Sequence, residues 1–317
     1  MPSLDPVILF FILGVVAGLS RSDLRLPAPI HDFLSMVLLL AIGLKGGVAL
    51  SQQPLGEVVP QVIAVGLMGG LMPLLAFPVL YRLGHLPRAD AASVAAHYGS
   101  VSVGTYAVAA AFLAHHDVTF EDHMPVFVAV LEIPAIVVGI LLARGLEKGT
   151  RWGRMAQEVF LGRGLVLLIG GLLIGLGAGP EGVAPIKPLF FDLFKGVLAL
   201  FLLDMGLIAA GHLGDLRRHG VFLLGFGLVM PLVGATIGAT LGSALGLSVG
   251  GVALLSTMAA SASYIAVPAA FRMIVPEANP ALSLGASLGV TFPFNILLGV
   301  PLYYQLALQV HAFMEAL

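Results

Sequence analysis

Cysteine is missing from all 317 residues of the chain. This absence excludes a disulfide framework, a thiolate nucleophile and a metal site built on cysteine. The histidines and carboxylates show no HExxH or related ligand spacing, so the sequence gives no sign of a zinc hydrolase either. We therefore expect no cofactor.

Charge is scarce as well. Asp, Glu, Lys and Arg make up 10% of the residues, whereas soluble domains carry about 25%. Because 59% of the residues are hydrophobic, most of the chain must be solvated by a lipid bilayer rather than by water. The net charge of −2 gives no indication of a nucleic-acid partner.

What the sequence does contain is a series of apolar runs separated by polar breaks. Most approach the roughly 20 residues that a helix needs to cross a bilayer, and they predict an all-α membrane protein with ten transmembrane helices. The predicted spans are residues 7–19, 30–50, 60–80, 91–113, 124–142, 159–176, 189–210, 221–245, 249–273 and 281–308. The first is short, but it lacks the positively charged start of a secretory signal, so we interpret it as a retained span.

The basic residues lie on one side of this arrangement. If the spans alternate, twelve of the 15 share the side of the odd-numbered loops: Arg21, Arg25, Arg82, Arg88, Arg144, Lys148, Arg151, Arg154, Arg163, Arg217, Arg218 and Arg272. Basic loops remain in the cytoplasm. We therefore expect a bacterial inner membrane protein with both termini outside.

The chain also repeats itself at a nearly constant offset, from 157 residues (Gly14 to Gly171) to 163 residues (Ile42 to Met205). The other matches pair Gly18 with Gly175, Met72-Pro73-Leu74 with Met230-Pro231-Leu232, Ser100-Val101-Ser102 with Ser261-Ala262-Ser263, and Pro134 with Pro293. Five spans per repeat is an odd number, so the second repeat enters the membrane upside down. We expect a first inverted repeat at residues 1–143, a basic cytoplasmic linker at 144–158 and a second repeat at 159–317.

Spans 4 and 9 are rich in small and hydroxyl residues at mid-span. Glycine weakens span 4, and Pro268 removes a backbone donor from span 9. We predict that both helices unwind near the bilayer centre and present amides, carbonyls and hydroxyls to an ion. Close helix packing through small residues is the alternative. The candidate substrate-binding residues are Gly99, Ser100, Ser102, Gly104, Thr105, Ser261, Ala262 and Ser263.

Ionisable residues inside spans are costly, at roughly 2.5–3.5 kcal/mol each. Lys45 and Asp204 lie at nearly matching depths in spans 2 and 7, so we interpret them as structural or gating charges and expect an ion pair between them. Direct contact with the substrate or with an ion is the alternative. Asp192 and Lys195 lie near the entrance of a span, where snorkelling to the interface explains them.

Span 5 has features of a sodium site. Glu132 precedes Pro134, whose ring leaves the carbonyl of Val130 free. Capping a helix end or pairing with an internal hydroxyl would explain Glu132 equally well. Asn295, near the matching proline of span 10, would add an uncharged oxygen or make an interhelical hydrogen bond. The candidate sodium ligands are Glu132, Ser102, Ser263 and Asn295.

Segments spread over nearly the whole chain, in the same order, resemble the sodium-dependent bicarbonate permease family. They are IGLKGG at residues 42–47, GSVSVGT at 99–105, EIPA at 132–135, DMG at 204–206, GDLRR at 214–218 and AASASYIAVPAAFRMIVPEANP at 259–280. Tyr264 stands where well-studied members carry an acid, and the long cytoplasmic insert of the family is reduced here to a short basic linker.

The resemblance implies a trimer of ten-helix inverted repeats. Spans 1, 2, 6 and 7 would form a gate domain, and spans 3–5 and 8–10 a core domain. Bicarbonate would bind between the broken spans 4 and 9, with sodium close by and a P-II-like regulatory protein as a cytoplasmic partner. By motif position the implied site residues are Gly99, Ser102, Thr105, Ser261 and Ser263, with Glu132 as the acid of span 5.

We therefore expect a sodium-dependent transporter that imports bicarbonate or a similar small anion by alternating access, and not an enzyme. A sodium/proton antiporter and a sodium-coupled carrier of small organic anions remain alternatives. So does an intramembrane hydrolase that uses Ser100 and His97, which lie three residues apart, although no GxSG-like context surrounds this serine. His97 is otherwise a hydrogen-bonded interior histidine. A sensor or scaffold without transport is the remaining possibility.

Overall fold

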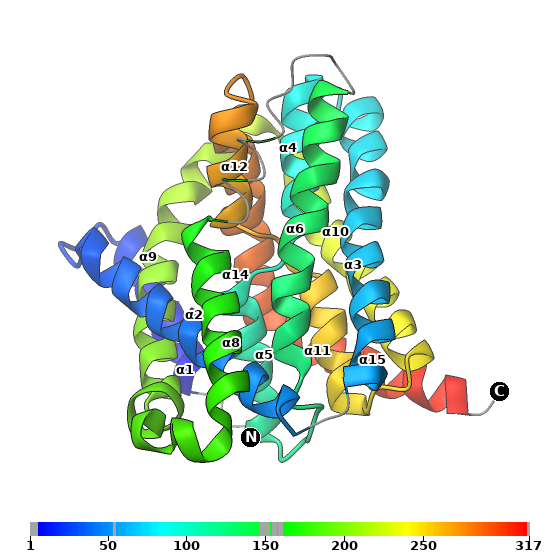
Figure 1. Cartoon of the computed structure of the whole chain (residues 1–317). Coiled ribbons are helices and arrows are strands. Elements are labelled where there is room, and N and C mark those ends of the chain that lie inside the picture. The colour runs from blue at the N-terminus through cyan, green and yellow to red at the C-terminus, as the bar shows by residue number, and fades with distance from the viewer. Residues whose placement is uncertain (1–5, 53–54, 146–152, 154–156, 158–160, 316–317) are drawn as a thin grey trace.

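The computed structural model describes residues 6–52, 55–145, 153, 157 and 161–315, and within them every regular element is a helix (Figure 1). The α-helices are α1 (Pro6–Leu19), α2 (Ala28–Leu50), α3 (Leu55–Pro78), α4 (Arg88–His97), α5 (Val103–His115), α6 (Met124–Arg144), α8 (Arg163–Val183), α9 (Phe194–His219), α10 (Val221–Ala244), α11 (Val249–Ala259), α12 (Ala266–Ile274), α13 (Pro280–Leu284), α14 (Phe292–Phe294) and α15 (Val300–Glu315). The predicted all-α class is confirmed for this part of the chain.

Seven helical stretches in the described residues are long and apolar enough to cross a membrane. They are Ala28–Leu50, Val58–Leu83, Met124–Arg144, Arg163–Ile186, Phe194–His212, Val221–Ala244 and Pro280–Met314. The helices α1, α5 and α11 are apolar but shorter. The chain is therefore a multi-pass membrane protein, and its first helix, α1, and its last, α15, both lie in the lower half of Figure 1.

Two long helix pairs pack at very close range. The helix α2 runs along α8, and α1 runs along α9. A Cβ atom added at Gly43 would collide with the backbone of Leu168, and one added at Gly14 would collide with the backbone of Leu203. Only glycine allows the backbones of these pairs to approach so closely.

The remaining helices form a second packed group. The helix α3 lies against α4 and α6, and α10 lies against α11 and α15. Large side chains fill the space between them, among them Met72, Phe127, Phe292 and Tyr303, all almost completely buried. This group holds the two helices that are interrupted at their centres.

Some predicted boundaries differ from the observed ones. The sixth span was expected at residues 159–176. The helix α8 begins at Arg163, the non-helical backbone of Gly179 (φ 63°, ψ −173°) interrupts it just before Pro180, and a further helical turn follows to Val183. Residues 159 and 160, and nearly all of the predicted linker at 144–158, lie outside the described residues.

The tenth span, expected at residues 281–308, is not a uniform α-helix. Two π-helical stretches, Gly285–Thr291 and Asn295–Gly299, separate α13, α14 and α15. Pro293 and Pro301 have no backbone N–H, so hydrogen bonding shifts to a wider turn around them.

Candidate functional site

Two interrupted helices form the candidate site. The helix α4 ends at His97 and α5 begins at Val103, while α11 ends at Ala259 and α12 begins at Ala266. Figure 1 shows α4 and α12 in the upper half of the molecule and α5 and α11 in the lower half. The expected unwinding is therefore present at residues 98–102 and 260–265, which we call the first and the second break.

Side chains in the first break fix the start of α5. Ser102 Oγ accepts a hydrogen bond from the backbone N–H of Thr105 at 3.1 Å, and the Thr105 hydroxyl donates to the same oxygen at 2.8 Å. Serine at this position caps a helix, because it satisfies an N–H that has no partner within the helix. The cap leaves the positive end of α5 at the break.

The two breaks contact each other directly, although they lie about 160 residues apart in the chain. The N–H of Ser102 donates to Ser261 Oγ at 2.9 Å, and the N–H of Ser263 donates to the carbonyl of His97 at 2.8 Å. All four residues are buried, and Ser261 also donates to the carbonyl of Met258. The structure thus brings three of the candidate residues, Ser102, Ser261 and Ser263, together where the two breaks meet.

Tyr264, at the end of the second break, reaches the start of α5. Its hydroxyl lies beside Ser102 and Gly104, and a Cβ atom at Gly104 would meet it. The hydroxyl is buried and lies within hydrogen-bonding reach of the Ser102 side chain and the Gly104 backbone. It therefore links the second break to the first turn of α5.

Glu132 lies on α6 next to the first break. It is buried, and the Ser100 hydroxyl donates to its Oε2 over a long 3.4 Å. A cavity of about 240 Å³ borders the same carboxylate, with Arg163 and Ile265 among its other lining residues. Glu132 therefore connects the first break to an open space that also touches the second break.

Asn295 is held in an interhelical hydrogen-bond network. Its Nδ2 donates to the carbonyl of Ala260 at 3.0 Å, and the Tyr303 hydroxyl donates to its Oδ1 at 2.7 Å. This is one of the two interpretations that the sequence left open. This hydrogen bond fixes the carbonyl of Ala260 in the second break, so Asn295 stabilises the conformation of the break.

His97 ends α4 and is completely buried. Its Nδ1 lies 2.7 Å from the carbonyl of Ser93, so Nδ1 carries the proton that this carbonyl accepts. The other ring nitrogen, Nε2, has no hydrogen-bond partner among the described residues and presents a lone pair.

The expected ion pair between Lys45 and Asp204 is wrong. Asp204 Oδ2 lies 2.5 Å from His31 Nδ1, whereas Lys45 Nζ lies over the rings of Phe194, at 4.6 Å, and Phe191, at 5.5 Å. Two residues at the same depth in different helices meet only if both side chains lie on the surfaces where the helices face each other. The sequence did not single out His31, because it lies in the first turn of α2 rather than well inside the span.

Sequence reasoning also missed a cavity beside Lys45 that is lined by residues such as Tyr106 and Asp122. Tyr106 reads as an ordinary apolar-face residue of span 4, and Asp122 as part of a solvated loop. Only the fold places them opposite α2.

The chain is similar to one described family of proteins over most of its length. A family model described as the Na+-dependent bicarbonate transporter superfamily matches residues 6–308. Among curated proteins, none gives a significant match.

Proposed function

The chain belongs to the Na+-dependent bicarbonate transporter superfamily, and from this premise we propose that it imports bicarbonate together with sodium by alternating access across a bacterial inner membrane. The observation that carries the proposal is the direct contact of two interrupted helices through Ser102 and Ser261. Irregular backbone at mid-membrane is tolerated where it lines a substrate site.

Bicarbonate would bind between the breaks. The positive end of α5, the N–H groups of its first turn and the hydroxyls of Ser102, Thr105, Ser261 and Ser263 are donors suited to a small oxyanion. In the structure the Ser102 N–H donates to Ser261 Oγ, and the Ser261 hydroxyl donates to the carbonyl of Met258. Anion binding would replace these two hydrogen bonds with bonds from the same N–H and hydroxyl to the substrate, so the breaks would separate slightly.

Sodium would bind beside Glu132. The Ser100 hydroxyl and carbonyls freed by the first break supply further uncharged oxygens next to this carboxylate. A carboxylate about 4 Å from an anion would repel it by about 4 kcal/mol at an effective dielectric constant near 20. Sodium bound at Glu132 removes that repulsion, which would make anion binding depend on sodium.

The proposal includes ten membrane crossings in two inverted repeats, residues 1–143 and 159–317. The glycine contacts support it: Gly14 of α1 touches Gly206 of α9, and Gly171 of α8 touches Gly43 of α2. In the alignment of the two repeats, Gly14 corresponds to Gly171 and Gly206 corresponds to Gly43. The two glycine contacts therefore occupy equivalent positions in the two repeats.

We further propose that α1, α2, α8 and α9 form a gate domain and the remaining helices a core domain that carries both breaks. The packing of α1 with α9 and of α2 with α8 supports this division. Both termini would lie outside. Assembly as a homotrimer and regulation by a P-II-like protein rest on the family resemblance.

Uptake into proteoliposomes tests the proposed function. An inward sodium gradient should drive accumulation of radiolabelled bicarbonate, and replacing external sodium with potassium should abolish it. Uptake that is indifferent to sodium would contradict the coupling. Sodium flux driven by a pH gradient without bicarbonate would support sodium/proton exchange instead.

A further inference from the structure

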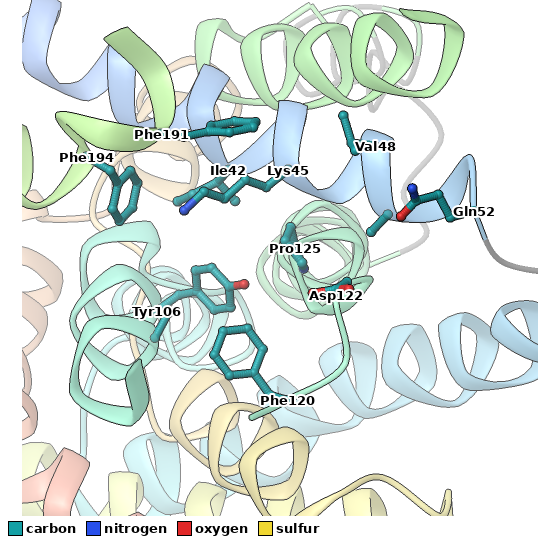
Figure 2. Close-up of a pocket in the computed structure, with 12 residues that line it drawn as sticks. Ile42, Lys45, Val48, Gln52, Tyr106, Phe120, Asp122, Pro125, Phe191 and Phe194 are labelled. Carbon is teal, nitrogen blue, oxygen red and sulfur yellow. The ribbon is translucent and has the colours of Figure 1, made fainter. Parts of the chain in front are cut away.

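A second cavity, separate from the breaks, is lined on one side by Lys45, whose side chain is exposed. It has a volume of about 370 Å³ and lies between α2, α5, the start of α6 and the segment that contains Phe191 and Phe194. Figure 2 shows the ammonium group directed toward Phe194 and Tyr106, away from Gln52 and Asp122. The cavity therefore has the positive charge of Lys45 at one end and the negative charge of Asp122 at the other.

Lys45 makes no ion pair with the described residues. Its neighbours are the faces of Phe191 and Phe194, which stabilise a cation only partly. Lys195 is a second cation within electrostatic range. A cation that lines a cavity within a membrane span without a carboxylate partner favours a small anion as its ligand.

The rest of the cavity fits the same ligand. The Tyr106 hydroxyl points into the cavity in Figure 2, and the Gln52 amide lines it, so both can donate hydrogen bonds to an oxyanion. Asp122 lines the far side and repels anions. These charges would place an anion at the end of the cavity formed by Lys45 and Tyr106.

The cavity is joined to the first break by α5. Tyr106 lies in the first turn of α5, and its N–H bonds to the carbonyl of Ser102 at 3.0 Å. The same short helix therefore presents its N-terminus to the breaks and Tyr106 to the cavity. The cavity also lies between helices of the proposed gate domain (α2 and α9) and of the proposed core domain (α5 and α6).

We propose that the Lys45 cavity is an outer docking site for bicarbonate, which the anion occupies before it reaches the breaks. This inference rests on the proposed function, because it names a second position of the same substrate on the outer side. Lys45 supplies the charge, Tyr106 and Gln52 supply hydrogen-bond donors, and Asp122 limits where the anion lies.

Charge substitutions test the site through the KM for bicarbonate at saturating sodium. Lys45→Gln should raise KM about tenfold, since charge-assisted hydrogen bonds are the strong ones, and Asp122→Asn should lower it. Lys187→Gln, which removes the same charge from an exposed position outside the cavity lining, should leave KM unchanged. Equal KM values for wild type, Lys45→Gln and Asp122→Asn would overturn the proposal.

The absence of cysteine allows a second test that does not depend on transport. In the Lys45→Cys variant, bicarbonate should slow modification of the new thiol by an anionic methanethiosulfonate, and nitrate at equal ionic strength should slow it less. Modification with an aminoethyl methanethiosulfonate restores a positive charge and should bring KM back toward the wild-type value. An unprotected thiol together with no rescue would overturn the inference. Wild-type protein without sodium-driven uptake would instead overturn the proposed function, whatever the labelling shows.

Discussion

The Ser102 hydroxyl has two roles. Its oxygen caps α5 by accepting from the Thr105 N–H and hydroxyl, and its proton, which the cap does not use, can be donated to an anion between the breaks. The first role stabilises the fold, and the second would contribute to anion binding. The two roles can be separated, because α11 is capped in the same way by Ser248, which accepts from the N–H of Gly251 at 3.2 Å.

We predict that Ser102→Ala and Ser248→Ala each lower the free energy of unfolding by about 1 kcal/mol, the usual cost of losing an N-cap. Only Ser102→Ala should also raise the KM for bicarbonate, because Ser248 lies at the opposite end of α11 from the second break. Thermal unfolding in detergent and uptake into proteoliposomes measure the two effects. An equal rise in KM in both variants would show that the effect is structural.

In the proposed mechanism, sodium coupling depends on Glu132. We predict that Glu132→Gln, which keeps the size of the side chain and removes its charge, raises the half-saturating sodium concentration by about tenfold or more. Glu277→Gln is the matched control, since Glu277 forms an exposed ion pair with Arg144, and such pairs contribute about 0–1 kcal/mol. Sodium titrations of bicarbonate uptake measure both. An unchanged sodium dependence in Glu132→Gln would remove this carboxylate from the sodium site.

At the scale of the helices, close packing between α2 and α8 depends on particular glycines. Gly171 faces α2, where an added Cβ would come within 2.9 Å of the carbonyl oxygen of Leu40. The adjacent Gly170 has no neighbouring atom in that direction. Two neighbouring positions of one helix thus differ only in what they face.

We predict that Gly171→Ala lowers the free energy of unfolding by about 1–3 kcal/mol through overpacking. Gly170→Ala should be neutral or stabilising by up to about 1 kcal/mol, because alanine favours a helix. Thermal unfolding of both variants in the same detergent measures the difference. Equal stability would mean that α2 and α8 do not pack as closely as described.

Helices were more predictable than side-chain neighbours. Apolar length depends on local sequence alone, so each of the seven long helices lies where a span was expected. The breaks were predictable because glycine, serine and proline oppose helix formation locally. The partners of Lys45, Asp204 and His31 depend on how helices are rotated against one another, which no local pattern records.

For the whole molecule, the distribution of basic residues predicts which loops lie outside and which lie in the cytoplasm. Ser22 follows α1, Ser51 follows α2, and Ala312 lies near the end of α15, and all three are exposed. If the chain crosses ten times, Ser51 and Ala312 lie outside and Ser22 lies in the cytoplasm.

We predict that a membrane-impermeant maleimide labels Ser51→Cys and Ala312→Cys in intact cells, and labels Ser22→Cys only after permeabilisation. The parent chain contains no cysteine and serves as the blank. Labelling of Ser51→Cys and Ala312→Cys from opposite sides would contradict an even number of crossings between them. It would also contradict the inverted repeat.

The central claim is that substrate binds where the two interrupted helices meet. The most direct measurement is a cryo-electron microscopy structure determined with bicarbonate and sodium present. The account predicts density between Ser102 and Ser261, with the hydrogen bond that now joins them broken, and a second density beside Glu132. An intact bond between these serines, with no density at either break under saturating bicarbonate and sodium, would contradict the account.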